Sequence, residues 1–198
     1  MIDEAKKYLG NALAHSKNPV ALISLGKDSL LLLYLLRELG ASIPLIWFRD
    51  KAPQETFRVI KEWGLTLYSY PPAVRYKVEN SVVSEYSIGD ARLPVIRDIS
   101  DEGQQVGTNT LAYFHYSFDT TFYGYKASDE ISLVSRTFEP EFQLGPTRMV
   151  APLYHFTDDE VLQMIEDFAI PYEPFNDDAL DCSLPIVPIE TFRQRFSL

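Results

Sequence analysis

The sequence has little cysteine and no long apolar run, and each shortage excludes a class of protein. Cys182 is the only cysteine among 198 residues, so one chain cannot form an internal disulfide, a thiolate zinc site or a four-cysteine iron–sulfur site. No apolar stretch reaches the roughly 20 residues that span a bilayer. Residues 1–7 also lack the basic-then-apolar order of a signal peptide. These absences predict a cytoplasmic protein with no membrane partner and no iron–sulfur cluster.

Basic residues are also scarce, and no block of them appears. The chain carries 28 acidic against 18 basic residues, a formal net charge of −10, so its surface disfavours nucleic acid as a partner. A hydrophobic fraction of 46% over 198 residues favours one domain, residues 1–198, with a proper core. From about residue 177 the sequence is loop-like, which predicts a loop-rich C-terminal tail.

The first 72 residues alternate between helix-like and strand-like segments. Apolar spacing predicts helices over residues 2–16, 28–39 and 54–63, the last two ending at Gly40 and Gly64. Short apolar runs predict buried strands over residues 19–24, 43–48 and 65–70. Such alternation is typical of a parallel sheet with right-handed crossovers.

The second half has fewer clear periods. We expect an exposed loop over residues 98–103, a helix over 109–118, a strand over 120–125 and a further strand over 131–135. Thr157 and Glu160 form a capping-box pattern ahead of an apolar helical face, which predicts a helix starting after Thr157.

The most informative segment is residues 24–29, Ser-Leu-Gly-Lys-Asp-Ser, between the first strand and a leucine-rich helix. The first N–H groups of a helix lack internal partners, so this turn suits an anion such as pyrophosphate. Ser24 and Ser29 add hydroxyl donors, Gly26 permits close approach, and Lys27 adds a charge. Asp28 is expected either to cap the helix or to hold Mg²⁺ on a phosphate. The alternative is an ordinary polar turn, because the Walker A spacing is absent.

These six residues resemble the PP-loop of the N-type ATP pyrophosphatases, Ser-Gly-Gly-x-Asp-Ser, with Leu25 in place of the first glycine. Residues 152–161 and 170–175 resemble the Pro-Leu-x-x-Trp-Thr-x-x-Asp-Val and Ile-Pro-Tyr-Asn-Pro segments of one branch of that superfamily. That branch contains the phosphoadenosine phosphosulfate (PAPS) reductases and the ATP sulfurylase small subunits. Residues 124–130 are similar to its Gly-x-Arg-x-x-Glu loop, with Lys126 at the arginine position.

The resemblance implies a three-layer α/β fold of the adenine nucleotide alpha hydrolase type. Its sheet would have five mostly parallel strands, with helices on both faces and the nucleotide at the carboxyl ends of the strands, where open α/β sheets bind ligands. It implies that Trp47, Phe48 and Arg49 lie near the adenine, although the two aromatic residues also fit a plain core strand. Lys126 and Arg148 are expected to contact phosphate or sulfate, and Arg136 is a weaker candidate for the same contact.

The resemblance leaves three functions open. The first is an enzyme that cleaves ATP at the α-phosphate with Mg²⁺, releases pyrophosphate and adenylylates an unidentified acceptor. The second is a reductase or sulfotransfer enzyme acting on PAPS or adenosine phosphosulfate (APS). The Glu-Cys-Gly-Leu-His segment of PAPS reductases is missing, so its thiol would come from Cys182 or a protein partner. The third is a non-catalytic nucleotide-binding subunit, alone or as a homo-oligomer.

Overall fold

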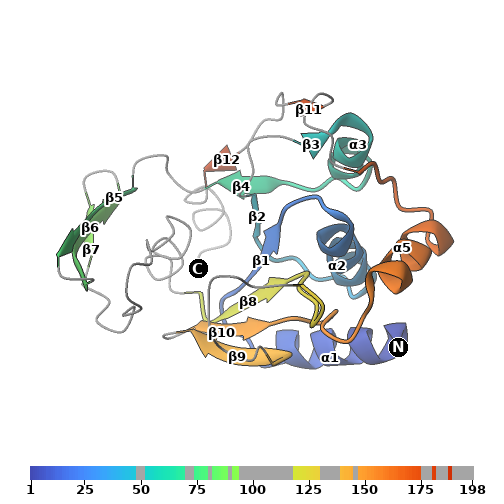
Figure 1. The fold of residues 1–198 in the computed structure, drawn as a ribbon, viewed down its shortest axis with the longest axis horizontal. Helices are drawn as coiled ribbons and strands as arrows, with labels where there is room; N and C mark the ends of the chain where they lie inside the picture. The colour runs from blue at the N-terminus through green and yellow to red at the C-terminus, as the bar shows by residue number, and fades with distance from the viewer. Residues whose placement is uncertain are drawn as a thin grey trace.

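The computed structural model describes residues 1–47, 52–69, 74–79, 82–88, 91–93, 118–129, 139–144, 147–174, 180–181 and 187–188. Its centre is a mixed sheet of seven strands in the order β12-β4-β2-β1-β8-β10-β9, counting the two-residue strand β12 (Figure 1). All neighbouring pairs are parallel except β10 with β9. The expected α/β class is confirmed, whereas the expected count of five strands is wrong.

The strands of this sheet are β1 (Pro19–Ile23), β2 (Leu45–Trp47), β4 (Leu67–Ser69), β8 (Thr120–Tyr123), β9 (Glu141–Leu144), β10 (Thr147–Val150) and β12 (Val187–Pro188). Two smaller antiparallel sheets accompany it. One pairs β3 (Ala52–Pro53) with β11 (Leu180–Asp181), and the other contains β5 (Val74–Glu79), β6 (Val82–Ile88) and β7 (Ala91–Leu93).

Four helices pack on one face of the main sheet: α1 (Ile2–Ala14), α2 (Lys27–Glu38), α3 (Gln54–Glu62) and α5 (Asp158–Asp167). The register aligns Ala21 of β1 with Leu45 of β2 and Phe122 of β8. These residues share one core cluster with buried residues from all four helices. Because side chains alternate along a strand, one face of the sheet therefore supplies this core.

The opposite face of the sheet is buried but carries none of the described helices. Val20, Thr121 and Met149 lie next to each other in the register and are at most 7% exposed, yet none belongs to the core cluster. Helices were expected on both faces, and within the described ranges they cover only one.

The order of the strands reverses next to β1. The chain runs from β1 outward to β2 and β4, and then returns to the other side of β1 for β8 and β10. Adjacent crossovers that leave in opposite directions open a crevice at the carboxyl ends of the two central strands. Here that crevice lies between the residues that follow β1 and those that follow β8.

The ends of the helices follow the sequence closely. Gly40 and Gly64 adopt positive φ angles of 64° and 63° just after α2 and α3, as their role as helix stops requires. Within the described ranges, every helix falls short of the length and hydropathy that crossing a bilayer requires. The expected loop over 98–103 and strand over 131–135 lie outside the described residues, as does the expected helix over 109–118 apart from Phe118.

Candidate functional site

The turn between β1 and α2 has an unusual backbone. Leu25 adopts a φ of 58°, in the left-handed region that non-glycine residues rarely occupy, and its side chain is completely buried. Gly26 then serves as the N-cap residue, and α2 begins at Lys27. The leucine therefore keeps the conformation that suits a glycine, at the position where the PP-loop pattern has one.

Hydrogen bonds within the turn fix its shape without capping the helix. The Gly26 N–H donates to Ser24 Oγ at 3.2 Å, and Ser29 Oγ donates to the Gly26 carbonyl at 3.0 Å. The two serine hydroxyls lie 3.3 Å apart. Among the described residues no side chain caps α2, whose N-cap residue is Gly26, and the Asp28 carboxylate pairs with Lys27 and Lys126 instead, so the expectation that Asp28 caps this helix is wrong. The first turn of α2 keeps its positive dipole end without a side-chain acceptor.

The segment that follows β8 presses directly onto this turn. A Cβ atom at Gly124 would lie 2.7 Å from the backbone carbon of Asp28 and 2.8 Å from the amide nitrogen of Ser29. No other amino acid fits such a contact without moving the backbone. Gly124 therefore allows the two loops to meet at the carboxyl ends of β1 and β8.

Five charged side chains, which we call the charge cluster, lie beside these loops: Lys27, Asp28, Lys126, Asp129 and Asp158. The Lys126 side chain is fully buried, and its Nζ lies 2.7 Å from Asp28 Oδ1, 2.9 Å from Asp129 Oδ1 and 3.2 Å from Asp158 Oδ1. Lys27 Nζ lies 3.1 Å from Asp28 Oδ2 and 2.9 Å from Asp158 Oδ1. The cluster joins α2, the β8 loop and α5.

The ion pairs of the charge cluster favour its charged forms. Burial alone would lower the pKa of Lys126, but its hydrogen bonds to Asp28 and Asp129 raise that pKa overall. The pKa of Lys27 is raised in the same way, with Asp158 as the main hydrogen-bond partner that opposes burial. Hydrogen bonds from Lys27 and Lys126 lower the pKa of Asp158. Two ammonium and three carboxylate groups give the cluster a formal charge of −1.

A pocket of about 200 Å³ opens at the same place. It is lined by residues of β1, the loop, α2 and the β8 segment, namely Leu22, Ser24, Asp28, Ser29, Tyr123, Gly124 and Tyr125. The hydroxyl oxygen of Tyr123 is buried and has no hydrogen-bond partner among the described residues. Three of the predicted loop residues, Ser24, Asp28 and Ser29, thus line a pocket at the point where the strand order reverses, whereas Gly26 and Lys27 are not among its lining residues.

The other predicted residues are placed less simply. Arg148 lies opposite Thr120 at the amino ends of the parallel strands, away from the loop. Its guanidinium donates to the Ala12 carbonyl at 2.9 Å and lies 3.6 Å from Glu141 Oε1. Arg148 therefore joins α1 to the sheet, and the structure does not bring it to the pocket.

Trp47 ends β2 opposite Ile23, so its backbone lies at the sheet edge from which the loop leaves. The remaining predicted contact residues, Phe48, Arg49 and Arg136, lie outside the described residues, and so does Cys182.

One member of the charge cluster, Asp158, could not be identified from the sequence, where the capping-box pattern predicts only the start of a helix. In the structure it contacts both lysines. Asp129 stands at the acidic position of the pattern that residues 124–130 resemble, and it contacts Lys126 within the same loop. The contact of Asp158 with Lys27 depends instead on the packing of α5 against α2 (Figure 1).

A resident metal centre finds no support in the described ranges, where no three His, Cys, Asp or Glu side chains are arranged to hold an ion. A Mg²⁺ ion that arrives with a nucleotide needs only one or two protein carboxylates in addition to phosphate oxygens. Asp28, which lines the pocket, fits that requirement.

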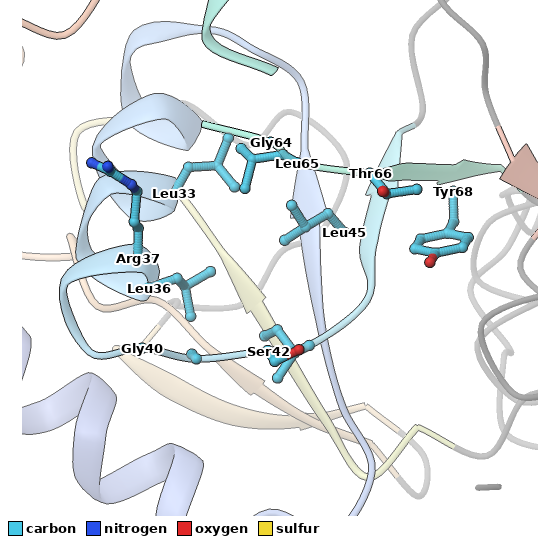
Figure 2. Close-up of a pocket in the computed structure, with 12 residues that line it drawn as sticks. Leu33, Leu36, Arg37, Gly40, Ser42, Leu45, Gly64, Leu65, Thr66 and Tyr68 are labelled. Carbon is cyan, nitrogen blue, oxygen red and sulfur yellow. The ribbon is translucent and has the colours of Figure 1, made fainter. Parts of the chain in front are cut away.

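A larger cavity, of about 400 Å³, lies elsewhere. Figure 2 shows its lining, with Leu33, Leu36 and Arg37 of α2 on one side and Leu45 and Tyr68 on the other. It opens at the amino ends of β2 and β4, beside the glycines that end α2 and α3. Among the described residues that line it, none belongs to the charge cluster, and Arg37 is the one charged side chain. The chemistry therefore favours the smaller pocket.

No protein-family model matches this sequence, and no curated protein matches it either. Any conclusion about function therefore depends on the residues and geometry of the site.

Proposed function

We propose that this chain is an adenine-nucleotide-binding enzyme of the PP-loop type that cleaves ATP at the α-phosphate and adenylylates an acceptor in the cytoplasm. One observation carries the proposal. The loop over residues 24–29 leaves the central strand where the strand order reverses, and it enters α2 at Gly26 with no side-chain cap from the described part of the chain. Such a turn directs backbone N–H groups and a helix dipole toward a ligand at the carboxyl ends of the strands.

The side chains around the loop suit a pyrophosphate group. Ser24 and Ser29 line the pocket, and among the described residues their hydroxyls bond to each other and to the loop backbone, so they can turn toward phosphate oxygens. Lys27 is part exposed and supplies an ammonium group on a long side chain. The two hydroxyls and the ammonium group would position the ligand and neutralise its charge, as enzymes that transfer phosphoryl-type groups require.

Bound Mg²⁺ would neutralise charge on the phosphates of the ligand, and Asp28 is the residue that would hold it. Both Asp28 oxygens lie within 3.1 Å of a lysine nitrogen. We infer that Asp28 also keeps Lys27 and Lys126 beside the loop.

The burial of Lys126 favours a second candidate, a protein that binds nucleotide without catalysis. Its side chain is fully buried against three carboxylates and does not line the pocket. A sulfonucleotide-reducing activity with PAPS or APS remains a further proposal that rests on the resemblance of residues 152–175.

Calorimetry with Mg²⁺-ATP tests binding. Lys27→Ala is expected to weaken binding by about 1.5–3 kcal/mol through loss of a charge-assisted contact. Lys6→Ala is the matched control, because Lys6 pairs with Glu38 on the surface. Equal affinities for wild type and Lys27→Ala would remove Lys27 from the site.

Two further assays separate the candidates. Pyrophosphate released from ATP in the presence of an acceptor library indicates the enzyme, whereas binding without release indicates the non-catalytic protein. A thermal-shift series with ATP, AMP, APS and PAPS ranks the nucleotides, because a ligand raises apparent stability according to its affinity.

A further inference from the structure

Asp158 contacts both lysines of the charge cluster through one carboxylate oxygen. Its Oδ1 atom is 2.9 Å from Lys27 Nζ and 3.2 Å from Lys126 Nζ. One oxygen between two ammonium groups is also the arrangement that a phosphate oxygen adopts. The carboxylate belongs to α5, whereas Lys27 belongs to α2.

The three carboxylates of the charge cluster are not equally free to leave. Asp28 contacts both lysines from within α2, and Asp129 accepts from both the backbone N–H and the Nζ of Lys126. The Asp158 side chain is 62% exposed, against 21% for Asp28 and 34% for Asp129. An exposed ion pair contributes little to stability, so Asp158 can separate from Lys27 at small cost.

The helix that carries Asp158 does not depend on this ion pair for its start. Thr157 and Glu160 form a complete capping box at the start of α5, through their own backbone and side-chain contacts. Val161 and Ile165 bury the other face of the helix in the core. Replacing the Asp158 carboxylate with a neutral side chain therefore leaves intact the cap and the core contacts that stabilise α5.

We propose that Asp158 competes with the anionic group of the ligand for Lys27 and so limits the affinity of the loop for polyanions. The inference rests on the proposed function, because it takes the loop as the ligand site. With Asp158 in place the charge cluster has a formal charge of −1, and without it the charge is zero. An incoming pyrophosphate group therefore meets less repulsion, and a freer Lys27, when Asp158 is neutralised.

Isothermal titration with inorganic pyrophosphate tests this role in wild type, Asp158→Asn and Asp159→Asn. The control Asp159 lies in the same turn of α5, is exposed, and loses the same charge without any ion pair to the two lysines among the described contacts. Asp158→Asn is expected to bind about fivefold more tightly, the equivalent of about 1 kcal/mol for one exposed ion pair. Asp159→Asn is expected to stay close to wild type.

The outcomes separate the two proposals. If Lys27→Ala weakens pyrophosphate binding but Asp158→Asn leaves it equal or weaker, the competition is overturned and the proposed function stands. An equal gain in both asparagine variants indicates a general charge effect and also overturns it. If neither wild type nor Asp158→Asn binds pyrophosphate, both proposals fall. Asp158→Ser serves as a second variant, and each protein is first checked for a cooperative melting transition.

Discussion

The backbone of Leu25 adopts a conformation that costs free energy, with a φ of 58°. A leucine in the left-handed region costs about 1–2 kcal/mol relative to glycine, and such strain persists where the surrounding structure fixes it. Here the fixing contact is the core, because the side chain is fully buried. The loop thus combines a backbone suited to glycine with an apolar anchor.

The first prediction compares Leu25→Gly with Leu25→Ala. Both variants lose the buried side chain and leave a similar cavity, but only alanine retains a Cβ at a φ of 58°. Relief of strain outweighs the extra chain entropy of unfolded glycine, so Leu25→Gly is expected to be more stable than Leu25→Ala by about 0.5–1 kcal/mol. Urea unfolding measures the difference, and the reverse order would show that the positive φ is not strained.

The second prediction concerns two buried hydroxyls without partners among the described residues, those of Thr121 and Tyr123. Burying an unpaired hydroxyl costs about 1–3 kcal/mol, so Thr121→Val and Tyr123→Phe are expected to keep or increase the free energy of unfolding. Thr120→Val is the control, since Thr120 lies 2.8 Å from the Ser16 hydroxyl and should lose about 1 kcal/mol. A clear loss in either test variant would reveal a partner for that hydroxyl.

At the scale of elements, the capping box of α5 yields the third prediction. Thr157 Oγ1 accepts from the Glu160 N–H at 3.3 Å, and Glu160 accepts from the Thr157 N–H at 2.8 Å. Thr157→Ala is expected to cost about 1 kcal/mol of stability, whereas Thr157→Ser keeps the cap and costs little. The melting midpoint measures both, and an unchanged midpoint for the alanine variant would contradict this start of the helix.

The fourth prediction tests the contact between the β8 loop and α2. Gly124→Ala places a Cβ 2.7 Å from the Asp28 backbone and is expected to destabilise the fold by about 1–3 kcal/mol. Gly10→Ala in α1 is the matched control. Among the described residues its Cβ would meet the Leu39 side chain at 3.8 Å, an ordinary contact, so helix propensity predicts a gain of about 0.5–1 kcal/mol. Equal stabilities for the two variants, measured by urea unfolding, would contradict the close approach of the loops.

The elements that the sequence predicts well are those whose local pattern matches their burial. Helix α2 begins and ends one residue earlier than expected, and β1 ends one residue earlier. The agreement is close because an apolar run marks each element and a glycine marks the end of α2. The sequence did not predict strand β10, because the polar residues Thr147 and Arg148 interrupt the apolar run that would indicate a buried strand. Its antiparallel partner β9 alternates polar and apolar residues but is only four residues long. Strand β10 pairs with the distant strand β8, and β9 pairs with its neighbour β10, so pairing rather than local propensity marks both strands.

The same distinction applies to the site. The loop over residues 24–29 could be predicted because its residues are consecutive and their order resembles a known pattern. The ion pair between Lys27 and Asp158 could not, because 130 residues separate its partners and only the packing of α5 on α2 brings them together. Arg148 is the opposite case. The sequence predicted that it contacts the phosphate or sulfate of the ligand, but it lies at the amino ends of the parallel strands, away from the loop.

At the scale of the whole molecule, the fifth prediction concerns stability in acid. Hydrogen bonds from Lys27 and Lys126 hold the pKa of Asp158 below its ordinary value of 3.8. The unfolded chain therefore takes up this proton at higher pH than the folded protein, so stability falls as the pH drops through that range. The stability difference between wild type and Asp158→Asn is expected to shrink below about pH 4 in urea unfolding. A difference that stays constant from pH 7 to pH 3 would contradict the ion pairs in solution.

The central claim is that the turn between β1 and α2 binds the linked phosphates of a nucleotide. The most direct measurement is an NMR titration of the isotope-labelled protein with inorganic pyrophosphate, following the backbone amides. We predict that the amides of Gly26, Lys27 and Ser29 show the largest saturable shifts, and that Lys27→Ala greatly reduces them. Saturable shifts confined to other parts of the chain, with these amides unmoved, would contradict the account.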